Sequence, residues 1–369
     1  MLTLNIRKVK TGFTLIVLFI SLIIISCDKE SDKNQYIPTS DLDDTLIRAA
    51  DLSFLPGIEA EGTIYYNLNG QQAPAMTILA EAGMNTVRVR LWHIPASMHS
   101  DLAEVKTFAA KIKAHGLKLW LSVHYSDTWA DPGYQYKPEA WKNLEPAVLN
   151  DSIYNYTTRV VRALEPDYIQ IGNEINSGFI WPEGHTSNPD QFLKMLASGC
   201  KAVRDNSDDC RIILHFAGYD GADDFFNLVR TIDYDLIGIS FYPIWHGKNL
   251  NLLQSSIRIL AVKYNKKLVI AETAYPFTLG WNDWTDNILG DSSQLIPDFP
   301  PTPDGQQTFL EKIRRISESK PLLSGFAYWG AEWIAYRGPE AINGSPWENQ
   351  ALFDFNNKAL PAISAFSKE

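Results

Sequence analysis

The segment TVRVRLW, residues 86–92, alternates apolar side chains with Arg88, Arg90 and Trp92. Successive side chains of a β-strand point to opposite faces, so this strand has one apolar face and one face that carries charge and an aromatic ring. The segment KLWLSVHY, residues 118–125, has the same alternation and also ends in polar side chains. Such strands are typical of a closed barrel whose outer face is covered by helices.

Eight short segments of this kind are separated by helical segments along the chain. The predicted strands cover residues 50–54, 86–92, 118–125, 168–174, 211–217, 235–242, 267–272 and 323–330. The clearest amphipathic helices cover residues 102–116, 152–165, 189–205, 252–264 and 305–319. Alternating strands and helices predict a parallel sheet, and eight units are the number in a (β/α)8 TIM barrel. A doubly wound sheet is the alternative, but no glycine-rich phosphate loop follows the first strand. We therefore predict the α/β class, with one (β/α)8 catalytic domain over residues 48–369.

The composition indicates which kinds of molecule the protein binds. The 369 residues include 43 Asp and Glu against 33 Lys and Arg, which gives a formal net charge of −10. An acidic chain is a poor match for the phosphate backbone, so we expect no nucleic-acid partner. The 11 Trp, 16 Tyr and 17 Phe indicate either an aromatic core or flat surfaces on which a ligand can stack.

The first residues have the features of an export signal. Arg7, Lys8 and Lys10 precede an uncharged run over residues 11–26, which is too short for a comfortable membrane span. The run ends in Ile-Ile-Ser before Cys27, which resembles a bacterial lipobox. We predict a signal peptide over residues 1–26, lipidation of Cys27, and a polar tether over residues 27–47. A lipoprotein anchored to a bacterial membrane, at the outer membrane or cell surface, follows from this prediction. An ordinary signal peptide with an incidental cysteine is the alternative.

Polar side chains gather at the predicted C-terminal ends of the strands. On the predicted inner face these are Arg90, His124, Glu174, His215, Tyr242 and Glu272. Active sites of (β/α)8 barrels lie at this end, and buried charges are costly unless they are paired or used in chemistry. The sequence therefore predicts an active site at the mouth of the barrel.

Two carboxylates at a barrel mouth suit the cleavage of glycosidic bonds. Glu174 and Glu272 end the fourth and seventh predicted strands and should face each other. One carboxyl must be protonated to give a proton to the leaving oxygen, and the other must be ionised. We expect Arg90 to be the partner that keeps one of them charged.

Four longer motifs surround these residues, namely VRVRLWHIP at 87–95, HYSDTWADPG at 124–133, NEINSGFIWPEG at 173–184 and SFYPIWHG at 240–247. Together they resemble glycoside hydrolase family 53, the β-1,4-galactanases, from about residue 49 to about residue 335. The resemblance implies a retaining clan A glycosidase that cleaves galactan or arabinogalactan side chains of pectin. It implies that Glu174 is the acid/base, that Glu272 is the nucleophile and that Asn173 contacts the sugar 2-hydroxyl. Thr128 and Ile244 stand where the family has aromatic residues.

The loops above the barrel contain the residue types that bind sugars, since pyranose rings stack on aromatic faces and their hydroxyls need hydrogen-bond partners. The predicted substrate-binding residues are Arg90, Trp92, His124, Tyr125, Asp127, Trp129, Asn173, Trp181, Tyr242, Trp245, His246 and Trp329. Trp333 and Glu332 lie in the same predicted loops. We expect a galactan or galacto-oligosaccharide substrate and a monomeric enzyme.

A cofactor is not expected, although the resemblance leaves room for one structural ion. Some family members carry calcium in the loop after the seventh strand. Here that loop offers Asp283, Asp286, Asn287 and Asp291 as oxygen ligands.

Several alternatives remain open at this point. The same machinery could act on mannan or a β-1,4-glucan, and a surface glycan-binding lipoprotein without catalysis is a further hypothesis. The sequence does not decide between internal and terminal cleavage. Cys200 and Cys210 form either a disulfide or two buried thiols. No pattern of Cys and His residues has the spacing of a zinc site.

Overall fold

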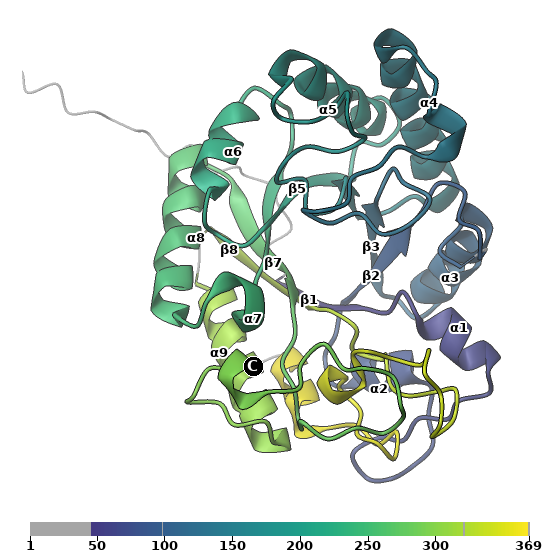
Figure 1. Cartoon of the computed structure of the whole chain (residues 1–369), viewed down its shortest axis with the longest axis vertical. Helices are drawn as coiled ribbons and strands as arrows, with labels where there is room; N and C mark the ends of the chain where they lie inside the picture. Colours follow the sequence, from purple (N-terminus) through teal and green to yellow (C-terminus); the bar gives the residue numbers. More distant parts are fainter. Residues whose placement is uncertain (1–45, 98, 320–321, 368–369) are drawn as a thin grey trace, which may run out of the picture. The chain divides into compact units, whose positions relative to one another are not determined.

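The computed structural model describes residues 46–97, 99–319 and 322–367. Over these residues eight parallel strands close into a barrel in the order β1 to β8 (Figure 1). The strands are β1 Ile47–Asp51, β2 Thr86–Leu91, β3 Lys118–Val123, β4 Tyr168–Ile171, β5 Arg211–Ala217, β6 Leu236–Ser240, β7 Lys267–Thr273 and β8 Leu323–Tyr328. The prediction of a (β/α)8 barrel is confirmed. The predicted signal peptide, Cys27 and almost all of the predicted tether lie outside the described residues.

Helices surround the barrel, and most begin with a residue suited to a helix start. Their bounds are α1 Leu55–Ala60, α2 Ala75–Glu81, α3 Leu102–Ala114, α4 Pro146–Leu164, α5 Pro189–Arg204, α6 Ala222–Leu228, α7 Pro243–His246, α8 Leu250–Tyr264 and α9 Pro303–Ser317. The Asp101 side chain caps α3 by accepting a hydrogen bond from the amide of Glu104. Proline at the first turn starts α4, α5 and α9, where its missing amide hydrogen has no helical partner to lose. Among the described residues, no helix is both long and apolar enough to cross a membrane.

The first strand begins earlier than predicted. The sequence pattern placed it at residues 50–54, whereas β1 covers Ile47–Asp51. All five of its residues are buried, because the strand has helices on one side and the barrel interior on the other. This shift brings Asp51 to the C-terminal end of β1, where the site lies.

The seventh strand departs from simple alternation. Regular alternation would put Leu268 and Ile270 on the inner face with Glu272, but the structure places Val269 and Ala271 among the interior residues. Ile239 of β6 pairs with Ile270, and the next residue pairs with Glu272, so the strand contains a bulge. The extra residue turns Glu272 inward.

Cys200 and Cys210, the cysteines within the described residues, are free thiols and both are buried. Burial raises the pKa of the Cys200 thiol and of the Cys210 thiol to about 12, so both are protonated at neutral pH.

Candidate active site

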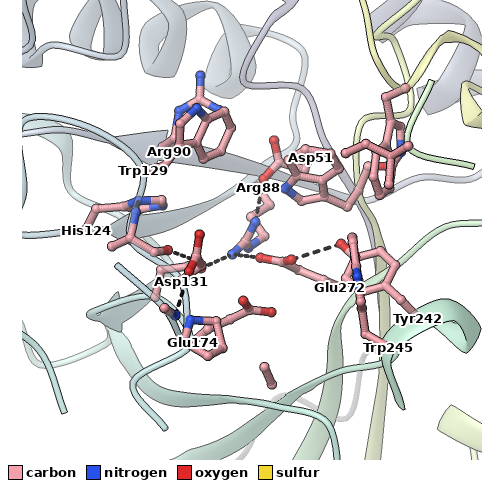
Figure 2. A pocket seen from close by; sticks show the side chains of 18 of the residues that line it. Asp51, Arg88, Arg90, His124, Trp129, Asp131, Glu174, Tyr242, Trp245 and Glu272 are labelled. Atoms are coloured by element: carbon pink, nitrogen blue, oxygen red, sulfur yellow. Dashed lines mark hydrogen bonds and ion pairs between the residues drawn. The ribbon is translucent and has the colours of Figure 1, made fainter. Parts of the chain in front are cut away.

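A pocket opens at the C-terminal ends of the strands (Figure 2). Ten of the predicted site residues line it, namely Arg90, His124, Trp129, Asn173, Glu174, Tyr242, Trp245, His246, Glu272 and Trp329. They come from loops and strand ends all around the barrel, so closure of the sheet brings together residues that are far apart in sequence.

The two carboxylates face each other within this pocket. A carboxylate oxygen of Glu174 and one of Glu272 lie within 4.8 Å of each other. Glu174 is 9% exposed and Glu272 is 6% exposed, so water screens their mutual repulsion poorly. Glu174 follows β4 with a φ of 47°, a left-handed conformation that is uncommon for this residue type and turns the chain at the end of the strand.

Arg88, rather than Arg90, is the cation that pairs with Glu272. Its Nη2 donates to Glu272 Oε1 at 2.7 Å, and its Nη1 donates to Asp51 Oδ2 at 2.6 Å (Figure 2). Nη2 also donates to Asn173 Oδ1 at 2.9 Å. The Tyr242 hydroxyl donates to the second oxygen of Glu272 at 2.9 Å. Both oxygens of Glu272 are therefore held by donors, and the predicted pairing of a carboxylate with Arg90 is wrong.

Arg90 lies among aromatic rings instead. Its guanidinium carbon is 4.6 Å from the ring centre of Phe54, 4.5 Å from that of Trp92 and 4.2 Å from that of Trp129. Its Nε donates to the Ser100 hydroxyl at 3.1 Å. Burial lowers the pKa of Arg90 to about 10, which still leaves it charged at neutral pH. Arg90 thus contributes a cation and a rigid aromatic wall to the pocket.

A chain of hydrogen bonds links Arg88 to Glu174. The Arg88 Nε donates to Gln170 Oε1 at 2.8 Å, which turns the Gln170 amide nitrogen toward His215 Nδ1 at 2.9 Å. Because Nδ1 accepts this bond, the ring proton of neutral His215 is on Nε2, 2.8 Å from the Ser240 hydroxyl oxygen. Ser240 then donates to Glu174 Oε1 at 2.5 Å. The direction of every donor in this chain is set by the arginine at its start.

The electrostatics distinguish the two carboxyls. Burial and the negative charge of Glu272 raise the pKa of Glu174 to about 8, although the Ser240 hydrogen bond and Arg88 oppose the rise. Burial also raises the pKa of Glu272, and the Arg88 guanidinium and the Tyr242 hydroxyl oppose that rise through direct contact. Glu272 has the closer cation, so we assign the first ionisation of the pair to it.

His124 and His246 line the pocket, His215 lies behind it, and burial favours the neutral form of all three. Burial lowers the pKa of His124 and of His215 well below the ordinary value, and nearby arginines lower them further. His124 Nδ1 accepts a hydrogen bond from the Ala130 amide at 3.1 Å, which leaves the Nε2 proton available to a ligand. Burial lowers the pKa of His246 to about 4.

The comparison with known proteins agrees with this geometry. The family model described as Glycosyl hydrolase family 53 matches residues 47–366. The chain belongs to glycosyl hydrolase family 53. The match extends past the resemblance seen in the sequence, which ended near residue 335, and takes in the last part of the site.

Curated relatives and a solved structure of this family resemble this chain over most of their length. An arabinogalactan endo-beta-1,4-galactanase of Cellvibrio japonicus is 35% identical, covering 87% of this chain and 90% of the relative. An endo-beta-1,4-galactanase of Bacillus subtilis is 29% identical, covering 87% and 85%. The solved family 53 catalytic domain of Ignisphaera aggregans is 38% identical, with a TM-score of 0.83, covering 89% of this chain and 97% of that domain.

The site of this family 53 protein includes residues that the sequence reasoning did not select. They are Asp51, Arg88, Asp131 and Trp347, together with smaller lining residues, whereas Trp333, which the sequence placed in the predicted sugar-binding loops, does line the pocket. Asp51 was missed because β1 begins earlier than predicted. Arg88 shares the inner face with Arg90, so alternation alone could have suggested it. Trp347 follows β8 by many residues, and no pattern in the sequence marked it.

Four predicted binding residues do not line the pocket. Tyr125 is fully buried, and its hydroxyl lies 2.7 Å from the Thr157 hydroxyl of α4, so its prediction as a sugar contact is wrong. Asp127 organises the loops instead, because its oxygens accept hydrogen bonds from the amides of Ile94 and Glu139 at 2.8 Å each.

The other two are aromatic residues near the rim. Trp92 packs behind the lining, with its ring centre 5.3 Å from that of Trp129 in an edge-to-face arrangement. Trp181 is partly exposed outside the lining and packs beside Tyr136 and His185.

The calcium ligands predicted after β7 do not assemble as a set. Asp286 is exposed, and Asp291 caps a short 3-10 turn by accepting a hydrogen bond from the Ser293 amide. Asp283 and Asn287 do have a buried side-chain oxygen without a partner, and so does the nearby Glu348. Because Asp286 is exposed and Asp291 serves as a cap, the four predicted ligands do not fit the ion as a set, and we derive no step through calcium.

Among the described residues, Glu174, His215 and Glu272 form the group whose spacing could hold a metal ion. Both ring nitrogens of His215 already have protein partners in the hydrogen-bond chain described above. The group therefore fits a carboxylate pair with a supporting histidine. Hydrolysis by two carboxylates needs no cofactor.

Proposed function

We propose that this protein is a retaining endo-β-1,4-galactanase in which Glu272 is the nucleophile and Glu174 is the acid/base. The separation of the two carboxyls carries this proposal. Retaining enzymes place their carboxyl groups ~5–5.5 Å apart, whereas inverting enzymes need ~6.5–9.5 Å to admit a water molecule. Oxygens of Glu174 and Glu272 lie within 4.8 Å of each other, which supports direct attack by one carboxylate.

In the first step, ionised Glu272 attacks the anomeric carbon while Glu174 gives its proton to the departing glycosidic oxygen. Arg88 and Tyr242 hold Glu272 in place through both of its oxygens. Ser240 occupies Oε1 of Glu174 as a donor, so the acid proton resides on Oε2. The bond from the anomeric carbon to the leaving oxygen breaks as the bond to Glu272 forms.

In the second step, water replaces the leaving group. Neutralisation of Glu272 by the covalent bond removes the negative charge that raised the pKa of Glu174. Glu174, now ionised, takes a proton from the water as the water attacks the same carbon and releases Glu272. Two inversions at one carbon retain the anomeric configuration.

The substrate class is supported by the relatives and by the walls of the pocket. The relatives from Cellvibrio japonicus and Bacillus subtilis are named endo-beta-1,4-galactanases. Trp129, Trp245, Trp329, Trp333 and Trp347 line the pocket, which suits the stacking of sugar rings.

Product analysis on linear β-1,4-galactan tests the function. We expect short galacto-oligosaccharides with the β-configuration at the newly formed reducing end, as followed by NMR early in the reaction. Arabinan, mannan and a β-1,4-glucan should give no products. Preferential cleavage of mannan or glucan, or initial release of the α-anomer, would contradict the proposal.

Azide rescue tests the two roles separately. Glu272→Ala should be inactive, and azide should then attack from the vacated face and yield an α-galactosyl azide. Glu174→Ala should still be glycosylated by a substrate with an acidic phenol leaving group, and azide should give the β-azide. A β-azide from Glu272→Ala would reverse the assigned roles.

We further propose that the enzyme is a monomeric lipoprotein, anchored to a bacterial membrane through Cys27 after removal of residues 1–26. The charged start, the uncharged run and the lipobox-like end of that run support this. Cys27→Ala should move the enzyme from the membrane fraction to the soluble fraction with unchanged kinetics on short oligosaccharides. Retention of the variant in the membrane would argue against lipidation, and light scattering of the soluble variant tests the monomer.

A further inference from the structure

The loop after β3 leaves the pocket and continues as a row of exposed aromatic side chains. Asp131, Pro132 and Gly133 line the pocket, and Tyr134, the next residue, is 58% exposed. Tyr136 is 57% exposed, and its ring centre is 6.1 Å from that of Tyr134. We call Tyr134, Tyr136 and the partly exposed Trp181 the aromatic platform.

The aromatic platform is held in place by backbone contacts between two loops. Trp181 follows β4, and its ring centre is 6.4 Å from that of Tyr136. Its backbone amide donates to the carbonyl of Gln135 at 2.7 Å, and its indole nitrogen donates to the carbonyl of Ser177 at 3.1 Å. Tyr134 exchanges two backbone hydrogen bonds of 3.0 Å with Asp131. The rings therefore present a fixed surface, which costs little entropy to cover.

Gln135, which lies between the two tyrosines, connects the aromatic platform to the catalytic acid Glu174. Gln135 is 1% exposed, and its amide nitrogen donates to the carbonyl of Asn173 at 2.7 Å and to that of Glu174 at 3.2 Å. Successive side chains of an extended segment alternate, so Gln135 points inward to the acid while its neighbours point outward. Gln135 thus ties the aromatic platform to the backbone of the residue that protonates the leaving oxygen, and on this ground we assign the platform to the leaving-group side of the scissile bond.

The opposite side of the reacting centre has different aromatic residues. Tyr242, which binds the nucleophile, has its ring centre 5.1 Å from that of Trp245 and 5.8 Å from that of Trp347. The nucleophile ends β7, which is four strands from β3 in a closed barrel of eight. The aromatic platform is thus separate from the rings that surround the nucleophile.

We propose that Tyr134, Tyr136 and Trp181 bind further sugar residues of the polysaccharide on the leaving-group side, beyond the pocket itself. This inference rests on the proposed function. The occupant is the part of the chain that continues from the leaving group, because the aromatic platform begins one residue after the pocket lining. Half-exposed rings offer flat faces to the C–H faces of the sugars, and the tyrosine hydroxyls remain available to sugar hydroxyls.

The test compares a long substrate with one that lacks sugars on the leaving-group side. In the Tyr134→Ala/Tyr136→Ala variant, KM for galactan should rise about tenfold with kcat nearly unchanged, the effect expected for two lost stacking contacts. An aryl glycoside of a short galacto-oligosaccharide has only a phenol on that side, so its kcat and KM should not change. The Tyr134→Phe/Tyr136→Phe variant keeps the rings and should retain most of the wild-type KM for galactan.

A matched tyrosine on the helical shell provides the control. Tyr154 lies on α4, and Tyr154→Ala should leave KM for galactan unchanged. Unchanged KM in the double alanine variant would overturn the inference, and so would an equal loss of kcat on the aryl glycoside, because that result would mean disturbance of Glu174 through Gln135. Failure of wild-type enzyme to cut galactan would instead refute the proposed function, so the two failures are distinguishable.

Discussion

Replacing Ser240 by alanine should raise the pKa of Glu174 and move the basic limb of the pH profile to higher pH. The Ser240 hydroxyl donates to Glu174 Oε1 at 2.5 Å and thereby stabilises the ionised carboxylate. The other charged or titratable groups that act on Glu174 are Glu272, Arg88 and Asp131, and the substitution leaves all three in place. The change therefore removes the one side-chain hydrogen bond that Ser240 gives to Glu174 and leaves the charges around Glu174 in place.

The size of the effect follows from the charge of the acceptor. A hydrogen bond to a charged group contributes about 1.5–3 kcal/mol, whereas one to a neutral group contributes about 1 kcal/mol. The difference, about 0.5–2 kcal/mol, corresponds to a shift of roughly one pH unit. The wild-type pKa of Glu174 is raised to about 8, so the basic limb of kcat/KM should move upward by about one unit from there.

The assay is kcat/KM on a galacto-oligosaccharide over a pH series, for wild type, Ser240→Ala and a control. Ser324→Ala is the control, because Ser324 is a buried serine of β8 whose hydroxyl has no hydrogen-bond partner. Ser240→Ala also leaves the buried Nε2 proton of His215 without an acceptor, which should lower the free energy of unfolding by about 1–3 kcal/mol. A basic limb that stays in place or moves to lower pH would refute the reasoning, whatever happens to stability.

Three further predictions concern stability and thiol chemistry. In Arg88→Lys, the single ammonium group cannot pair with Asp51 and Glu272 at once. The free energy of unfolding in urea should therefore fall by about 3 kcal/mol, and kcat should fall sharply. An unchanged free energy of unfolding would show that the buried ion pairs are dispensable. Burial raises the pKa of Glu332 to about 8, so between about pH 4.5 and 8 the unfolded chain loses a proton that the folded chain keeps, and stability falls as pH rises. Glu332→Gln should make that slope shallower by up to about 1.4 kcal/mol per pH unit, and an unchanged slope would contradict the assignment. In the Cys27→Ala protein, Cys200 and Cys210 should resist a thiol reagent when native and both react in urea without reductant, whereas a disulfide would leave both unreactive.

The sequence was sufficient for the parts of the barrel that follow strict alternation. Val87 and Val89 face the helices and Arg88 and Arg90 face inward, as the pattern of residues 86–92 predicted. Glu174 was placed at the mouth by its position at the end of a strand. Such inferences work because the period of a strand is fixed by backbone geometry.

Other features depend on contacts that no local pattern records. The bulge in β7 reverses the alternation just before Glu272, and it is visible in the register of β7 against both β6 and β8 rather than in the residue types of β7. Arg88 and Arg90 share one face, and only the depth of each in the barrel decides which of them meets a carboxylate. Trp347 reaches the pocket from a segment beyond β8, and its indole nitrogen donates to the carbonyl of Trp329 at 3.2 Å.

The ion pair between Arg88 and Glu272 has a consequence for the synthesis of galactose chains by a variant enzyme. Removal of the Glu272 side chain leaves a buried guanidinium facing an empty space beneath the anomeric carbon, with Asp51 as its remaining carboxylate partner. Such a space suits fluoride, so a galactosyl fluoride of the α-configuration should be accepted as a mimic of the covalent intermediate. Ionised Glu174 would take the proton of an acceptor hydroxyl, whose oxygen would attack the anomeric carbon while the carbon–fluorine bond breaks and fluoride leaves. Because the variant has no nucleophile to break the new bond, the product would persist. In such a variant Arg88, which holds the nucleophile during hydrolysis, would instead support the synthesis of β-linked galactose chains.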